Sequence, residues 1–279
     1  MKPRFYVLRA LFLPLIACLL FAACGSTTGS GSSATAALKA VTLNVFAAAS
    51  LTESFKEIAT NFQAAHSGVT VRYNFGGSQL LEQQMASGAP SDVFASADQT
   101  NMKKAADAGL VGTSQPFVKN KLVVIIPANN PGKINSLKDL ANKGVKIDIE
   151  ASAVPSGKYT RKILGKMAKS PEYGSSYESA VKANFVSQED NVKAVVTKVQ
   201  LGEADAGFVY LTDVTKNVSS QVKEITIPDN FNVIAEYPIA TTKNSANASV
   251  AKAFVQYVLS SRGQAILQKY GFISVSSSS

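Results

Sequence analysis

The sequence predicts an α/β protein made of two lobes, and two of its features carry that prediction. After about residue 40, short apolar runs that suit strands alternate with amphipathic stretches that suit helices. At two successive junctions a serine, first Ser50 and then Ser78, stands between the end of a strand and the start of a helix. The chain has 279 residues, 46% of them hydrophobic, so it can bury a substantial core as two domains or as one large one.

The first half of the chain alternates strand and helix. Strands are expected at 41–47, 69–75, 93–96 and 122–126, and helices at 51–65, 80–87 and 99–108. The first helix places Phe55, Ile58 and Phe62 on one face, which is the spacing of an amphipathic helix. A glycine follows each of the other two helices and marks its end. The last strand is wholly apolar and stops at Pro127, as expected for a strand buried on both faces.

The second half repeats this alternation. Strands are expected at 146–150, 184–186, 206–210, 222–227 and 233–239, and helices at 159–168, 191–201, 249–259 and 263–270. Pro127 and Pro238 close apolar strands on either side of the central block. We therefore expect two hinge crossings between a first lobe (residues 40–122 and 240–279) and a second lobe (residues 123–239), with a ligand cleft between them. One continuous sheet is the alternative.

The N-terminus predicts an export signal. Residues 1–23 combine a basic start, an apolar run and small residues before Cys24, which together predict a signal peptide. Residues 24–39 are rich in Gly, Ser and Thr and are expected to form a flexible linker. A cysteine followed by such a linker resembles a bacterial lipoprotein signal. We therefore expect an extracytoplasmic protein that the lipidated Cys24 anchors to the membrane.

Two alternatives remain open for this segment. The residues before Cys18 fit the lipidation sequence better than those before Cys24, where Phe21 replaces the usual leucine. Lipidation at Cys18 would leave a short apolar region, however, so Cys24 is preferred. Ordinary secretion with cleavage near Ala23 is the second alternative. Both cysteines lie in this segment, so no disulfide or thiol chemistry is expected in the remainder of the chain.

Composition and motifs exclude several functions. The net charge is +9, but the basic residues are scattered and form no long run, so no nucleic-acid partner is expected. The single histidine, His66, lies in a polar turn and leaves no base for a Ser-His-Asp or Cys-His site. No residue spacing supports zinc or calcium. Residues 152–159 lack the first glycine and the hydroxyl residue of a phosphate-binding P-loop. We therefore expect neither an enzyme nor a cofactor.

The junctions between strands and helices predict an anion site instead. Ser50 and Ser78 are expected to be N-caps, where backbone N–H groups lack intrahelical partners and the helix dipole is positive. The amides of Ser156 and Val192, at two later helix starts, and the phenol of Tyr210, at a strand end, would add donors. For these three, an ordinary helix start or ordinary packing is the alternative. All five are neutral donors, which suits a fully ionised oxyanion that needs no acceptor.

Seven segments together resemble the periplasmic molybdate-binding proteins of ABC transporters. They cover the chain after the linker in the order of that family: 47–52, 77–78, 88–98, 154–157, 203–210, 237–240 and 270–272. The resemblance implies a type II periplasmic-binding-protein fold and a monomer that delivers its anion to a membrane permease. Sulfate or phosphate in place of molybdate is the alternative.

The resemblance also implies roles for single residues. Ser50 and Ser78 would each give a hydroxyl and an N–H to molybdate or tungstate, Ser156 and Val192 an N–H, and Tyr210 its phenol. The protein would then provide no direct ligand to the metal. Ser156 stands where alanine is common, which leaves the amide role intact, and its neutral side chain argues against the related class that adds carboxylate ligands. Gln79 and Leu80 replace the small polar residues that often follow the second serine.

Overall fold

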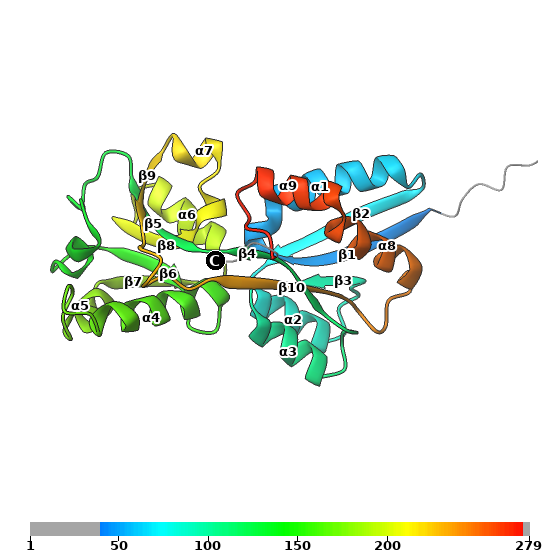
Figure 1. Cartoon of the computed structure of the whole chain (residues 1–279), viewed down its shortest axis with the longest axis horizontal. Coiled ribbons are helices and arrows are strands. Elements are labelled where there is room, and N and C mark those ends of the chain that lie inside the picture. The colour runs from blue at the N-terminus through cyan, green and yellow to red at the C-terminus, as the bar shows by residue number, and fades with distance from the viewer. Residues whose placement is uncertain (1–39, 276–279) are drawn as a thin grey trace, which may run out of the picture. The chain divides into compact units, whose positions relative to one another are not determined.

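The computed structural model describes residues 40–275. The predicted signal peptide, the linker and both cysteines lie outside these residues, so their assignment stays a prediction. Within residues 40–275, no helix combines the length and the apolar character that a membrane crossing requires. The described chain forms two sheets, each flanked by helices (Figure 1). This confirms the α/β prediction and excludes the single continuous sheet.

The first sheet has the strand order β2-β1-β3-β10-β4. β1 is parallel to β2 and β3, whereas β10 is antiparallel to β3 and β4. Figure 1 shows α1, α8 and α9 on one side of this sheet and α2 and α3 on the other. The bounds of these elements are β1 (Val41–Ala48), β2 (Val69–Gly76), β3 (Val93–Ala95), β4 (Gln115–Asn120), β10 (Ala235–Thr241), α1 (Thr52–Ala65), α2 (Ser78–Ala86), α3 (Gln99–Asp107), α8 (Ala248–Leu259) and α9 (Ser261–Lys269).

The second sheet has the strand order β7-β6-β8-β5-β9. β6 is parallel to β7 and β8, and β5 is antiparallel to β8 and β9. The bounds are β5 (Leu122–Pro127), β6 (Ile147–Glu150), β7 (Phe185–Glu189), β8 (Ala206–Tyr210), β9 (Val222–Thr226), α4 (Pro155–Ala168), α5 (Tyr177–Ala183), α6 (Val192–Gln200) and α7 (Lys216–Ser219). Three short 3-10 helices complete the fold: η1 (Ala49–Leu51), η2 (Leu137–Ala141) and η3 (Leu211–Asp213).

The core explains why these segments take their places. Every residue of β5 and of β8 is buried, as expected for apolar strands with neighbours on both sides. In the first lobe the predicted apolar face of α1 is fully buried, and its Phe62 ring meets the Phe254 ring of α8 edge-on at 5.3 Å between centroids. Burial of these faces sets the strand ends, and therefore the helix starts, that form the site described below.

The chain passes between the two sheets at two places. β4 ends at Asn120 and β5 begins at Leu122, and residues 227–234 connect β9 to β10. Asn232 ties the two crossings together, because its Nδ2 donates to the carbonyl of Leu122 at 2.8 Å and its Oδ1 accepts from the Leu122 amide at 3.2 Å. The two crossings that the sequence predicts are therefore present.

The prolines do not mark these crossings. Pro127 ends β5 inside the second sheet, and Pro238 lies within β10, next to a shift in the pairing with β4. The strand expected at 233–239 runs from Ala235 to Thr241 and belongs to the first sheet, although the limits of the two lobes stay a prediction. β4 and α5 were not expected: Pro116 and polar residues interrupt the apolar pattern of β4, and α5 is only seven residues long.

Candidate functional site

A small cavity between the two sheets is lined by four of the five residues that the sequence predicts for the anion site. Ser50 and Ser78 reach this oxyanion cavity from the first lobe, and Val192 and Tyr210 reach it from the second. The remaining lining residues include Glu150 and small residues such as Gly77 and Ala97. The space open to the centre of a water molecule is about 10 Å³. Such a volume holds about one water molecule and is far too small for an organic ligand.

The two serines follow strand ends, as predicted, but neither is an N-cap. Ser78 is the first residue of α2, which Gly77 caps, and Ser50 lies in η1, one short turn before α1. The Ser78 hydroxyl accepts a hydrogen bond from the amide of Ala97 at 2.9 Å. Because a hydroxyl that accepts can still donate its hydrogen, Ser78 keeps a donor for an anion.

Tyr237 is a partner of the site that the sequence analysis did not single out. Its phenol lies 2.9 Å from the hydroxyl of Ser50 and 3.4 Å from Nδ2 of Asn120, which donates to it. A phenol that accepts from Asn120 is free to donate to Ser50, so the hydrogen of Ser50 can point into the oxyanion cavity. Asn120 is the last residue of β4, so this chain of hydrogen bonds links the site to the first crossing.

The second lobe contributes buried hydroxyls that have no partner among the described residues. The Tyr210 phenol is buried, lines the oxyanion cavity and has no hydrogen-bond partner, whereas the equally buried Ser156 hydroxyl lies outside the lining, beside the Glu150 carboxyl. Burial, followed by the nearby Tyr237 and Glu150, raises the pKa of Tyr210 well above its usual value, so its phenol keeps the proton and remains a donor. Val192 is the first residue of α6, where the amide N–H groups of the opening turn lack intrahelical acceptors.

Glu150 corrects the expectation that the site contains donors only. Its side chain is 3% exposed, lines the oxyanion cavity and accepts from the amides of Ser156 at 2.7 Å and Gly157 at 3.2 Å. Burial raises the pKa of this carboxyl to about 8, although the two amides favour the ionised form. The Ser156 amide therefore has a carboxylate partner in this arrangement, and its role as an anion donor stays a prediction.

Two glycines let the backbone close around the cavity. A Cβ atom on Gly157 would lie 2.2 Å from the carbonyl oxygen of Ala151 and 2.3 Å from that of Glu150. A Cβ atom on Gly77 would lie 2.2 Å from the carbonyl oxygen of Asp190, which belongs to the other lobe. Both contacts are shorter than side chains tolerate, so only glycine fits at these positions.

Side chains also join the lobes around the cavity. Lys193 of α6 contacts Glu53 of α1 at 2.9 Å and Asp213 at 3.0 Å. Burial opposes the charge of Lys193, but Asp213 and Glu53 outweigh it and raise the pKa of this lysine. On the α4 side, Lys158 bonds to Asp98, at 3.4 Å, and to Thr100. The lobes are thus held in a closed arrangement.

The structure agrees with the argument against catalysis by His66. Its ring stacks on Phe62 at 4.0 Å between centroids, and its Nδ1 lies 2.9 Å from the Phe62 carbonyl at the end of α1. Across residues 40–275, no group of three His, Cys, Asp or Glu side chains could hold a metal ion.

The sequence analysis did not predict Glu150 and Tyr237 as residues of the site. Their positions on expected strands are the one sequence feature that could have indicated them: Glu150 ends a strand just before a helix start, and Tyr237 follows the second crossing.

Comparison with known proteins places the chain in a family. The model of the family described as bacterial extracellular solute-binding protein matches residues 43–273. The molybdate-binding protein ModA of Mycobacterium tuberculosis is 37% identical over 251 residues, covering 90% of this chain and 91% of the relative. YvgL of Bacillus subtilis, named as an ABC transporter substrate-binding lipoprotein, is 32% identical over 261 residues, covering 92% and 95%.

A solved structure agrees with these relatives. The substrate-binding domain of a molybdenum ABC transporter from Clostridium difficile superposes with a TM-score of 0.61 and 33% identity, covering 84% of this chain and 99% of that one. These matches confirm the resemblance drawn from the sequence motifs and the type II periplasmic-binding-protein fold. The relatives are solute-binding transport proteins and not enzymes. This chain belongs to the family of bacterial extracellular solute-binding proteins.

Proposed function

We propose that this protein captures molybdate outside the cytoplasm and delivers it to the permease of an ABC importer. The observation that carries the proposal is the oxyanion cavity, where the hydroxyls of Ser50 and Ser78 from one lobe meet the phenol of Tyr210 from the other. The phenol of Tyr210, which lines this cavity and has no hydrogen-bond partner, supports an anion there, because a buried polar group without a partner is costly unless a ligand satisfies it. The names of the relatives support molybdate as that anion.

Selectivity would come from the fit of neutral donors to the anion. Ser50, Ser78 and Tyr210 carry no charge, so a bound anion is held by hydrogen bonds whose lengths depend on its size. Each hydrogen bond to a charged acceptor that is too long loses about 1.5–3 kcal/mol of binding free energy. Molybdate and tungstate have nearly the same size and are both expected to bind, whereas the smaller sulfate leaves some of these bonds long. Sulfate or phosphate as the true ligand is the competing proposal.

Calorimetric titration of the protein with molybdate, tungstate and sulfate tests this proposal. We expect one-to-one binding of molybdate and of tungstate, and at least about a hundredfold weaker binding of sulfate. Two hydrogen bonds that are too long in the sulfate complex are enough to produce this difference in affinity. Equal binding of sulfate would retain the anion site and reject the selectivity. No heat with any of the three anions would reject the function.

The membrane anchor is a separate proposal. We expect Cys24 to be lipidated, which agrees with the lipoprotein named among the relatives. Replacing Cys24 with alanine should release the protein from the membrane fraction, and replacing Cys18 should not. Retention of the Cys24→Ala protein on membranes would contradict this assignment.

A further inference from the structure

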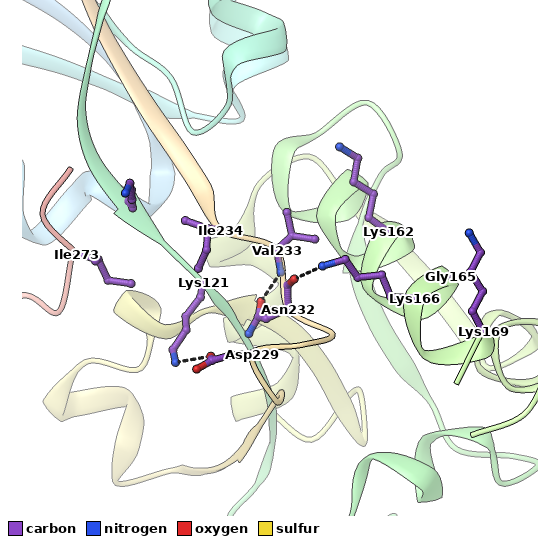
Figure 2. Close-up of a pocket in the computed structure, with 11 residues that line it drawn as sticks. Lys121, Lys162, Gly165, Lys166, Lys169, Asp229, Asn232, Val233, Ile234 and Ile273 are labelled. Carbon is purple, nitrogen blue, oxygen red and sulfur yellow. Dashed lines mark hydrogen bonds and ion pairs between the residues drawn. The ribbon is translucent and has the colours of Figure 1, made fainter. Parts of the chain in front are cut away.

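A second cavity, separate from the oxyanion cavity, lies beside the two crossings. Its volume is about 960 Å³, and Figure 2 shows the residues that line it. They come from β4, from both crossings, from α4 and from Ile273 after α9. Five of them are lysines, which we use to name the lysine cavity: Lys119, Lys121, Lys162, Lys166 and Lys169.

Two of these lysines lie in α4, and a third, Lys169, caps its C-terminus. Lys162, Lys166 and Lys169 follow each other at the i, i+4 and i+7 spacing that aligns side chains on a helix, and all three are exposed. The Lys166 ammonium donates to the carbonyl of Asn232 at 2.6 Å, which brings α4 against the second crossing (Figure 2). Like charges at this spacing repel each other, and an anion bound among them would remove that repulsion.

The acids around the lysine cavity are too few to balance these charges. Asp229 is the only acidic residue that lines it, and it pairs with Lys121 at 3.0 Å. That pair leaves the three ammonium groups of α4 without a carboxylate in the lining. The cavity is therefore strongly cationic on the α4 side, and its preferred ligand is an anion.

The remaining lining is apolar. Val233, Ile234 and Ile273 lie in the wall of the lysine cavity, and Ile234 is 39% exposed although it is a large hydrophobic residue. A cavity of this volume falls within the range that organic ligands occupy. Cationic and aliphatic groups that line the same cavity suit a ligand that is both anionic and partly apolar.

We propose that the lysine cavity binds an organic anion that carries a phosphate dianion on an apolar body. The charge and the spacing of the lysines select the phosphate, and the aliphatic wall accommodates the body. This site does not depend on the proposed function, because it shares no lining residue with the oxyanion cavity. A soluble phosphate monoester and the phosphomonoester headgroup of phosphatidic acid have the same chemistry, and the experiment separates them.

The test uses 1-naphthyl phosphate as the probe, titrated by its fluorescence into the protein with and without saturating molybdate. The variant Lys162→Glu/Lys169→Glu reverses two charges of the cavity and spares Lys166, which bonds to the second crossing. The matched control is Lys56→Glu/Lys252→Glu, which makes the same change of charge on exposed positions of α1 and α8. Inorganic phosphate and 1-naphthol serve as probes that lack the body or the charge.

We expect saturable binding of 1-naphthyl phosphate that molybdate does not displace. The cavity variant should weaken it at least about tenfold, and the control variant should leave it within about twofold. Inorganic phosphate and 1-naphthol should bind more weakly than the ester. If vesicles of phosphatidic acid bind through the same lysines more tightly than the ester, the phosphate belongs to a headgroup, and the soluble ligand is rejected. Absence of binding, equal binding by both variants, or displacement by molybdate would overturn the proposal.

Discussion

At the scale of single residues, Glu150 is the group that most changes the chemistry expected of the site. It accepts the two amides at the start of α4 through Oε2, which leaves Oε1 to carry a proton. Burial raises the pKa of this carboxyl from its ordinary 4.5 to about 8, and Asp213 contributes in the same direction. Between these two pH values the unfolded chain releases the proton and the folded chain keeps it. The Glu150 carboxyl therefore lowers the free energy of unfolding as the pH rises from about 4.5 to about 8.

The protonation of Glu150 predicts how anion binding depends on pH. Below about pH 8 the carboxyl is neutral and can donate to a bound oxyanion, whereas above it the carboxylate repels the anion. Molybdate affinity measured by calorimetry should therefore weaken by about tenfold between pH 7 and pH 9. Glu150→Gln keeps an acceptor for the amides and adds a neutral donor, so its profile should be flat. Asp107→Asn, at an exposed acid of α3, should follow the wild type, and identical slopes in all three proteins would disprove the coupling.

The serine hydroxyls give a second prediction at this scale. Ser50→Ala and Ser78→Ala each remove a donor to a charged acceptor, so each should weaken molybdate binding at least about tenfold. Tyr210→Phe also removes one hydroxyl donor and keeps the backbone, so its loss of affinity should be of the same order. Ser179→Ala, an exposed hydroxyl of α5 that bonds only within its helix, is the control. Affinity retained in both cavity serine variants would remove them from the site.

At the scale of elements, the start of α4 depends on Gly157. The Cβ of an alanine there would overlap the carbonyl oxygens of Ala151 and Glu150, which are backbone atoms that cannot move aside singly. Gly157→Ala should therefore destabilise the protein by about 1–3 kcal/mol, measured by urea unfolding. In Gly165→Ala, in the same helix, the new Cβ would lie 3.6 Å from Oε2 of Glu178, so the substitution should be neutral or stabilising by up to about 1 kcal/mol. Equal effects of the two substitutions would contradict the close approach.

Several element boundaries show why the site could be predicted only in part. The helix that the sequence places at 159–168 begins at Pro155, so Ser156 and Gly157 lie within its first turn. Proline suits the first turn because it has no N–H to pair there. The apolar period starts only at Tyr159, which is why the pattern located the helix and misplaced its start. Ser78 lies one residue inside α2, before the apolar period begins, and Ser50 lies in a 3-10 turn that precedes α1, so neither has the predicted capping role.

At the scale of the whole molecule, Lys193 connects the lobes across the site. Its contact with Glu53 joins α6 to α1, and Glu53→Gln removes this contact while leaving Asp213 as a partner. Molybdate binding should weaken by about two- to fivefold, since a partly exposed ion pair contributes up to about 1 kcal/mol. Glu57→Gln also removes a charge from α1, but Glu57 bonds Lys269 and Tyr270 within the first lobe. It should leave the affinity unchanged, and equal losses in the two variants would rule out a closing role for Lys193.

The sequence by itself determined the α/β class, most strands and helices, two crossings and five candidate donors. Periodic burial and strand–helix junctions are local properties of the chain. The burial of Phe55 and the positions of Ser50 and Ser78 at helix starts could therefore be predicted from the sequence. Only the tertiary structure decided that Glu150 and Tyr237 belong beside those donors and that the crossings lie at Asn120–Leu122 and 227–234. It also decided that lysines of α4 and Ile273 line one cavity. These are contacts between segments distant in the chain. They depend on how buried strands and helices pack, which no local pattern records.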